Sequence, residues 1–453
     1  MMREFSILDY GARPDTAELQ TAAIQSCIDD CFLNGGGTVI VPKGTFRTGG
    51  LRIRSDVTLL LKSGSVLCGS RDPMDYMAIR TDTVEPLKDD DRSDALYATN
   101  GNRKNNDHLN KPGSRWNNAL LRAVDAENIA VIGEEGALID GMDPFDEIGE
   151  EAYRGPHGMD FHRCRNVTLR GYTIQNTGNW AHALFDIVNL SVDHVTVLAG
   201  HDGVNIRSCE NVLIEDCNFY TGDDCIAGID NRNVIARRCE VNTACSGLRF
   251  GGTNAVIEDC HFYGPARYLF RGSLTKEEKR SGKPIPNAGD HRYNMLSLFT
   301  YNSDFSLDIR TEPGNIILRN CVCENADRFL HYNFSGNEPW QQNRPLKSIR
   351  FENVTATGIR YPITAYGDAA CPVRLEIIDC HLSFAKISGM QGMSLCHWED
   401  VLLKNVTVDG LDTDAFAKAW SDGPAIRAEN FRAEGVDREL LTAAKEPFSC
   451  KPI

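Results

Sequence analysis

Three aspartates at related positions are the residues of this sequence best suited to carry chemistry. Asp202 and Asp224 lie 22 residues apart, and Asp223 stands beside the second of them in a Gly222-Asp223-Asp224 corner. If a step of 22 residues returns the chain to the same place, the three carboxylates lie a few ångströms apart. Like charges so close cannot all ionise at low cost, so one carboxyl keeps its proton near neutral pH. Such a group can supply both an acid and a base.

A repeat in the surrounding sequence supports that step. Look-alike segments recur at steps of 23, 22, 22 and 21 residues, beginning at Asn166, Asn189, Asn211, Asn233 and Asn254. Each unit reads as a short β-branched strand, an Asn or Gly turn and another short strand. A fixed period of about 20–25 residues is typical of solenoids. We therefore expect an all-β fold, a right-handed single-stranded parallel β-helix in which each repeat forms one coil.

The period also indicates which side chains share a line along this helix. Trp180, Asp202, Asp224 and Ser246 are separated by one step of 22 each. Because stacked strands lie about 4.8 Å apart, residues one step apart should stand directly above one another. Apolar residues at Val204, Ile226 and Leu248 form a parallel line that we expect to face the interior.

The rest of the chain fits one continuous domain over residues 1–453. A helical stretch, Thr16 to Phe32, has Leu19, Ala23, Ile24, Cys27, Ile28 and Cys31 on one face, and we expect it to cap the N-terminal end. Two polar, aperiodic excursions are expected at about 72–118 and 264–300. Long loops on a solenoid commonly wall a groove on one face.

Composition narrows the possible partners. The chain has 48 Lys and Arg against 63 Asp and Glu, a net charge of −15, which disfavours nucleic acid. No apolar run reaches the length of a membrane span. The 16 cysteines show no Cys-x-x-Cys pair and no zinc spacing, so we expect free thiols, no metal and no cofactor. The first residues show no secretory signal, which predicts a cytoplasmic location. The oligomeric state is left open.

Several motifs, in order along the chain, resemble one enzyme family. They are Phe5-Ser-Ile-Leu-Asp-Tyr-Gly-Ala, Gly35-Gly-Gly-Thr-Val-Ile-Val-Pro-Lys-Gly, Gly136-Ala-Leu-Ile-Asp-Gly and Thr221-Gly-Asp-Asp-Cys-Ile-Ala. Together they resemble the polygalacturonase-like glycoside hydrolases of family 28, within the pectin-lyase-like β-helix superfamily. The resemblance implies inverting hydrolysis of a glycosidic bond by three aspartates. It makes Asp223 the acid, while Asp202 and Asp224 hold the attacking water.

The sequence departs from the family where substrate is bound. The family's Gly-His-Gly histidine is Ser246 here, and its Arg-Ile-Lys motif reads Asp308-Ile309-Arg310. In the family these groups engage a galacturonate carboxylate, so the expected substrate is a pectin-related or other plant-type oligosaccharide. The residues expected to bind it are His201, Ser246, Arg249, Arg310, Trp180 and Tyr332.

Two other functions remain open on the same fold. One is a uronate lyase or epimerase, which would remove a proton beside a carboxylate, commonly with calcium and a Lys or Arg base. The other is a carbohydrate-binding solenoid without catalytic activity. For a hydrolase, the two excursions favour cutting from a chain end, because they are long enough to close one end of a groove.

Overall fold

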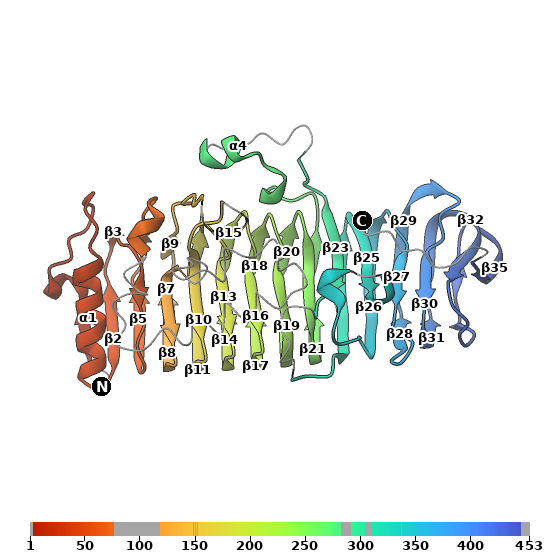
Figure 1. Cartoon of the computed structure of the whole chain (residues 1–453), viewed down its shortest axis with the longest axis horizontal. Coiled ribbons are helices and arrows are strands. Elements are labelled where there is room, and N and C mark those ends of the chain that lie inside the picture. The colour runs from red at the N-terminus through yellow and green to blue at the C-terminus, as the bar shows by residue number, and fades with distance from the viewer. Residues whose placement is uncertain are drawn as a thin grey trace.

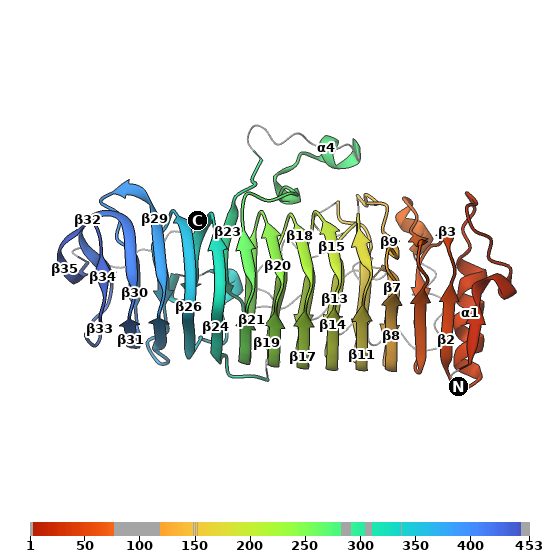
Figure 2. The same ribbon diagram turned by 180° about the vertical axis from the view of Figure 1, so that it is seen from behind.

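The computed structural model describes residues 3–76, 118–147, 149, 151, 153–281, 291–303, 310–336 and 338–444. Its strands pair in parallel from coil to coil and wind into one right-handed β-helix (Figures 1 and 2). The all-β prediction is therefore confirmed. Val204 pairs with Ile226, and Ile226 pairs with Leu248, so the step of 22 residues in this region is one turn of the helix.

Each coil contributes a strand to each of three stacks. The first stack contains β4 (Leu51–Arg52), β7 (Ala119–Val124), β10 (His157–His162), β13 (His182–Phe185), β16 (Val204–Arg207), the start of β19 (Ile226–Arg237), the start of β21 (Ser246–Glu258), β23 (Met295–Tyr301), β25 (Ala326–Asn333), β27 (Ile363–Tyr366), β30 (Met393–Cys396) and the end of β32 (Thr407–Ala419).

The second stack contains β1 (Glu4–Ser6), β2 (Gly37–Val41), β5 (Val57–Leu61), β8 (Glu127–Gly133), β11 (Arg165–Arg170), β14 (Val188–Asp193), β17 (Glu210–Glu215), the ends of β19 and β21, the start of β24 (Gly314–Glu324), the start of β26 (Ser348–Ile359), β28 (Val373–Ile378), β31 (Trp398–Lys404) and β33 (Arg427–Glu429).

The third stack contains β3 (Gly44–Arg47), β6 (Ser65–Cys68), β9 (Leu138–Asp140), β12 (Thr173–Gln175), β15 (Thr196–Ala199), β18 (Asn218–Thr221), β20 (Glu240–Thr243), β22 (His261–Tyr263), the ends of β24 and β26, β29 (His381–Ser388), the start of β32 and β34 (Arg432–Ala433). The last strand, β35 (Val436–Ala443), pairs with β32.

The recurring asparagines form a ladder at the corner before the second stack. Asn189 Nδ2 donates to Asn166 Oδ1 at 2.9 Å, and Asn211 repeats this contact to Asn189 at 3.1 Å. Each of these residues has a positive φ, between 54° and 64°. Asn tolerates this left-handed conformation better than most residues, and its amide also bridges adjacent coils. Both properties explain why the repeat returns to Asn.

The core fills the tube between the three stacks. Val204, Ile226 and Leu248 point inward as predicted and are buried, and His182 begins the same line. The two ring nitrogens of His182 are satisfied by the Gly203 carbonyl and the Tyr172 hydroxyl, both at 2.9 Å. Burial lowers the pKa of His182 to about 4, so the ring is neutral. The cysteines of the described residues are free thiols, all buried except the half-buried Cys371.

A helix covers the N-terminal end, but it starts later than predicted. α1 spans Thr21–Leu33 and buries Ile24, Cys27, Ile28 and Cys31. Residues 16–20 form a turn before it, in which the Gln20 side chain bonds back to Thr16, so Leu19 lies outside the helix and is exposed. Two short 3-10 helices, η1 (Ile7–Tyr10) and η2 (Pro73–Tyr76), flank the first coils. The apolar face was predicted correctly except for its first residue.

The described part of the second excursion folds back along the helix. It contains η4 (Arg271–Ser273) and α4 (Lys276–Ser281), and both views place α4 above the coil that contains β15 (Figures 1 and 2). The ladder resumes at β23, inside the range expected for this excursion. Residues 77–117, most of the first expected excursion, lie outside the described residues.

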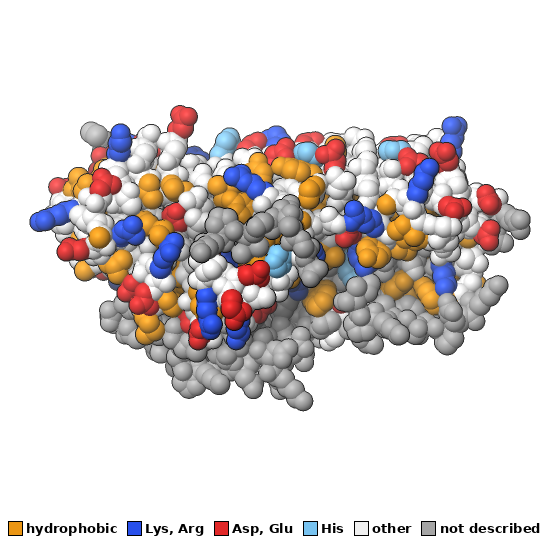
Figure 3. Space-filling model, turned by 90° about the horizontal axis from the view of Figure 1, so that it is seen from above, with side chains coloured by type: hydrophobic (Ala, Val, Ile, Leu, Met, Phe, Trp, Pro, Cys, Tyr) orange, Lys and Arg blue, Asp and Glu red, His pale blue; other side chains and the backbone are white. Residues whose placement is uncertain are grey.

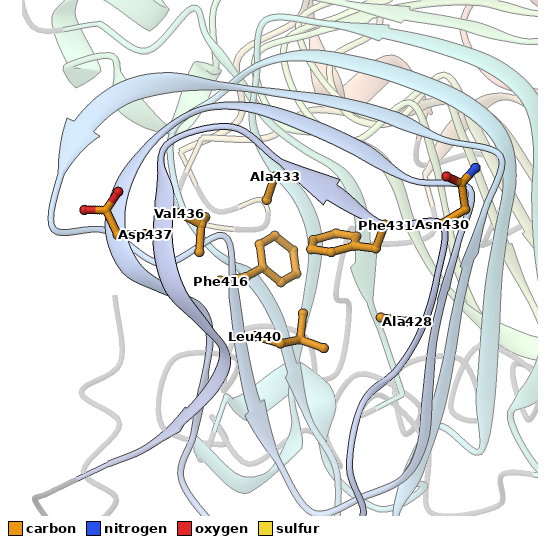
Figure 4. Close-up of a pocket in the computed structure, with 8 residues that line it drawn as sticks. All are labelled: Phe416, Ala428, Asn430, Phe431, Ala433, Val436, Asp437 and Leu440. Atoms are coloured by element: carbon orange, nitrogen blue, oxygen red, sulfur yellow. The ribbon is translucent and has the colours of Figure 1, made fainter.

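The C-terminal end holds an open pocket of about 450 Å³ at the last coils, lined by Phe416, Ala428, Asn430, Phe431, Ala433, Val436, Asp437 and Leu440 (Figure 4). Two more 3-10 helices, η5 (Phe334–Gly336) and η6 (Pro339–Gln341), follow β25. On the surface seen from above, basic and acidic side chains are interspersed (Figure 3). None of the helices in the described ranges is both long and apolar enough to cross a membrane.

Candidate active site

The first stack brings the three aspartates together on its outer face. Asp202 and Asp224 begin consecutive coils, since Gly203 N donates to Asp224 O and β16 pairs with β19 in the matching register. Asp223 occupies the preceding position, directly above His201. All three aspartates are buried. The sequence prediction that these carboxylates meet at one place therefore agrees with the structure.

Each carboxylate has a different polar partner. Asn205 Nδ2 donates to Asp202 at 2.8 Å. Asp224 accepts the backbone N–H of Ser246 at 3.0 Å and pairs with Arg249 Nη1 at 3.3 Å. The third carboxylate, Asp223, pairs with Arg154 Nη2 at 3.3 Å. Each of the adjacent Asp223 and Asp224 side chains thus has its own arginine partner.

Burial and mutual repulsion keep protons in this cluster. Burial raises the pKa of Asp202 well above its usual range, and the charges of Asp223 and Asp224 add to the rise. Burial and the charge of Asp224 also raise the pKa of Asp223, while Arg154 opposes this rise. The cluster therefore keeps a proton to higher pH than isolated carboxyl groups would, which favours a proton donor beside a base.

Arg154 was missed by the sequence analysis. It lies in the segment between β9 and β10, outside the repeat, and its guanidinium reaches from Asn179 Oδ1 at 3.2 Å to Asp223 Oδ2. Asn179 and Asp223 are two coils apart, with His201 between them. Loop residues do not follow the 22-residue repeat, so the repeat could not predict the position of Arg154.

His201 and Trp180 are close to the aspartates but deeply packed. His201 is fully buried, and its ring stacks on Tyr153 with centroids 6.0 Å apart. Burial, with the nearby charges of Arg154 and Arg271, lowers the pKa of His201 well below its usual range. Trp180 lies one coil below Asp202, between the His157 ring at 5.4 Å and the Arg207 guanidinium at 5.0 Å. Both residues pack beneath the carboxylates and have almost no surface exposed to solvent.

Ser246 and Arg249 lie on the other side of the carboxylates from His201 and Trp180. Ser246 continues the line of Asp202 and Asp224, and its hydroxyl donates to Thr300 at 3.3 Å. Arg249 is partly exposed, and its guanidinium lies 5.4 Å from the ring of Trp340. Of the two arginines predicted to bind substrate, Arg249 is therefore the one that lies beside the carboxylates.

Two predicted substrate contacts lie elsewhere. Arg310 pairs with Asp186 at 3.1 Å and donates to the Ser208 carbonyl at 2.8 Å. Ser208 is six residues after Asp202, which places this contact about 20 Å along the extended chain. Tyr332 is fully buried, packs edge-on against Tyr301 and accepts the Leu346 N–H. It is a core residue. Asp308 and Ile309 lie outside the described residues.

Two loops meet over the coils that precede the aspartates. Arg271 pairs with Asp143, and Arg280 pairs with Glu147. Lys279 Nζ lies 3.3 Å from the Tyr153 ring. These contacts join the second excursion to the segment that carries Arg154, more than a hundred residues earlier in the chain. They form a wall beside the carboxylates, on the side of the third stack.

Two groups within the described ranges place potential metal ligands within 4.8 Å of one another. One is Asp223, Asp224 and Cys245, where the carboxylates already pair with Arg154 and Arg249. The other is the surface group of Asp193, His194 and Asp216, where Asp216 pairs with Arg238. Guanidinium groups therefore compensate carboxylates in both.

Comparison with known proteins supports the resemblance. The family model described as glycosyl hydrolases family 28 matches residues 93–251. The chain is 30% identical over 257 residues to an exo-poly-alpha-D-galacturonosidase of Dickeya chrysanthemi, covering 49% of this chain and 41% of that protein. It is 29% identical over 229 residues to a mannuronan C5-epimerase of Azotobacter vinelandii, covering 49% of this chain and 22% of that protein. The chain thus matches less than half the length of either relative.

A solved structure shows the same fold. It is a hyperthermoactive exopolygalacturonase from Thermotoga maritima, with a TM-score of 0.63, 20% identity and coverage of 90% of this chain and 92% of that one. The segment matched by the family model, residues 93–251, includes Asp202, Asp223 and Asp224. The resemblance of this chain to the polygalacturonase-like glycosyl hydrolases of family 28 is therefore confirmed.

Proposed function

We propose that the protein is an inverting glycoside hydrolase that removes sugar from the end of a uronate-containing, pectin-related oligosaccharide. The observation that carries this proposal is the buried cluster of Asp202, Asp223 and Asp224, with raised pKa values at two of its members. Asp223 protonates the leaving glycosidic oxygen. Asp202 and Asp224 hold the water, and Asp224 takes its proton as it attacks the anomeric carbon.

The inverting course rests on the family resemblance. Oxygen atoms of Asp223 and Asp224 approach within 4.8 Å. A separation of about 5 Å is common in retaining enzymes, and inverting enzymes usually have roughly 6.5–9.5 Å. In the arrangement proposed here, two aspartates share one water and neither acts as a nucleophile, so the short separation is compatible with a single displacement.

Cutting from a chain end is supported by the difference between the two sides of the cluster. On the N-terminal side, the outward side chains His157, Asp160 and Trp180 are all buried. On the C-terminal side, the Arg249 side chain is 27% exposed and Tyr361 is 44% exposed. The wall joined by Arg271 and Asp143 stands on the closed side. A sugar chain would therefore enter over the later coils and stop at the carboxylates.

Product profiling tests this mode of action. We expect a polyuronate incubated with the enzyme to release mono- or disaccharide from the first minutes, with little loss of viscosity and no absorbance from a conjugated double bond. Rapid viscosity loss with mid-sized fragments would show internal cutting. An unsaturated product would favour a lyase, the main alternative on this fold. Binding without any turnover would favour a non-catalytic carbohydrate-binding solenoid.

A further inference from the structure

Arg328 is a buried cation that lacks an anionic partner. It lies in β25 and is only 6% exposed. Within the described ranges its guanidinium makes no hydrogen bond or ion pair, and its contact is with the ring of Tyr361, 4.4 Å from the ring centroid. A buried charge without a paired charge is costly, and burial accordingly lowers the pKa of Arg328.

Neighbouring acidic groups are engaged with other partners. Asp327 pairs with the exposed Arg360 at 3.2 Å. Glu338 lies 3.6 Å from His331 Nε2 and accepts from Asn333 at 3.5 Å. By contrast, the buried Arg122 on the same face pairs with Asp160 at 3.3 Å. The fold therefore buries a guanidinium where the available carboxylates compensate it only from a distance.

The position of Arg328 relates it to the carboxylates. Asp224, Ser246, Ser297 and Arg328 stand in one line, because Ser246 pairs with Ser297 and Ser297 pairs with Arg328. Three steps of about 4.8 Å place Arg328 about 14 Å from Asp224. This is the C-terminal side of the carboxylates, where Arg249 and Tyr361 are partly exposed and where the proposed function requires the remainder of the sugar chain to lie.

Two further groups complete the surroundings of Arg328. Tyr361 occupies the next position of the line and is 44% exposed. His331 lies three residues from Arg328 in the same strand, and its buried Nδ1 has no hydrogen-bond partner among the described residues. Burial lowers the pKa of His331, so the ring is neutral and can bond a sugar hydroxyl.

We propose that Arg328, Tyr361 and His331 form a distal subsite that binds a uronate residue of the substrate. The guanidinium fork takes the carboxylate in a charge-assisted contact, the tyrosine ring covers one face of the sugar, and the imidazole bonds a hydroxyl. This proposal rests on the proposed function, since it names the charged sugar that the same groove accepts beyond the carboxylates. Arg328 is also a cation that lies outside the Asp308-Ile309-Arg310 motif.

Binding to an inactive background separates this subsite from catalysis. We would titrate a galacturonate hexasaccharide into full-length Asp223→Asn protein by calorimetry, alone and with Arg328→Met added. We expect the Kd to rise about tenfold or more on loss of one charge-assisted contact. Arg360→Met is the matched control, because Arg360 is exposed and already paired with Asp327, and it should leave the Kd unchanged.

Two further measurements complete the test. A hexasaccharide with methyl-esterified carboxylates should bind the Arg328→Met and control proteins equally. Arg328→Met should also melt no lower than its background, because no ion pair is lost. An unchanged Kd for the galacturonate hexasaccharide, or a lower melting temperature without an effect specific to carboxylates, would overturn the proposal. If the wild-type enzyme cleaves no uronate but the Kd effect is present, the proposed function fails and the subsite stands.

Discussion

Asp223→Asn is expected to lower kcat by about a thousandfold or more while the protein stays folded. General acid catalysis contributes about 10²–10⁴-fold, and a carboxamide cannot deliver the proton that the leaving oxygen needs. The substitution keeps the shape of the side chain, so its oxygen can still accept from Arg154. It also removes one of three crowded negative charges, so the melting temperature should not fall. Initial rates on a uronate oligosaccharide and thermal melting measure both effects.

The matched control is Asp216→Asn. Asp216 lies on the surface, at the corner between the second and third stacks, where it pairs with Arg238. Loss of its charge should leave the rate unchanged. Asp202→Asn and Asp224→Asn should also be severely impaired, because the attacking water loses a carboxylate that positions it or accepts its proton. A rate within a few-fold of wild type for Asp223→Asn would be incompatible with the assigned proton donor.

Arg154→Met is expected to destabilise the folded protein by about 3 kcal/mol at pH values where Asp223 is ionised, because it breaks a buried ion pair and leaves Asp223 uncompensated. The loss should depend on pH. The pKa of Asp223 in the folded protein is already raised above its usual 3.8, and Arg154 opposes that rise. Protonated Asp223 therefore favours folding, a contribution complete below the unfolded pKa and lost as pH rises through the folded pKa.

Removing Arg154 raises that folded pKa further. The difference in melting temperature between wild type and Arg154→Met should thus be small near about pH 4 and large near about pH 7. Arg238→Met, which breaks an exposed pair with Asp216, is the control and should show little effect at either pH. A melting difference that is the same at both pH values would show that Arg154 acts through packing or its pair with Glu151 and not through Asp223.

The catalytic cluster could be predicted because hydrogen-bond register converts sequence period into position. Asp202, Asp224 and Ser246 follow one another without an insertion, so counting by 22 placed them in one line. The count fails beyond Ser246. The next two members of this line are Ser297 and Arg328, because the strands continue only after a long loop and then a shorter one. Arg328 was therefore not recognised from the sequence.

The same loss of register explains the errors at Tyr332 and Arg310. Tyr332 follows Tyr301 in an inward line that begins with Leu184 and Ile206, so it is core. Arg310 lies in the connection after β23, where a motif gives no register and Asp186 and Asp230 set the position of the side chain. Loop residues such as Arg154 are placed by tertiary contacts that no local pattern encodes.

The most direct test of the central claim is early-time proton NMR of a uronate oligosaccharide during turnover. Three carboxylates acting by a single displacement should release a sugar whose new reducing end has the inverted anomeric configuration, before mutarotation equalises the two forms. No signal of a carbon–carbon double bond should appear. A retained anomer would require an aspartate to act as nucleophile, and an unsaturated product would require a base beside the uronate carboxylate. Either result would contradict the roles given to Asp202, Asp223 and Asp224.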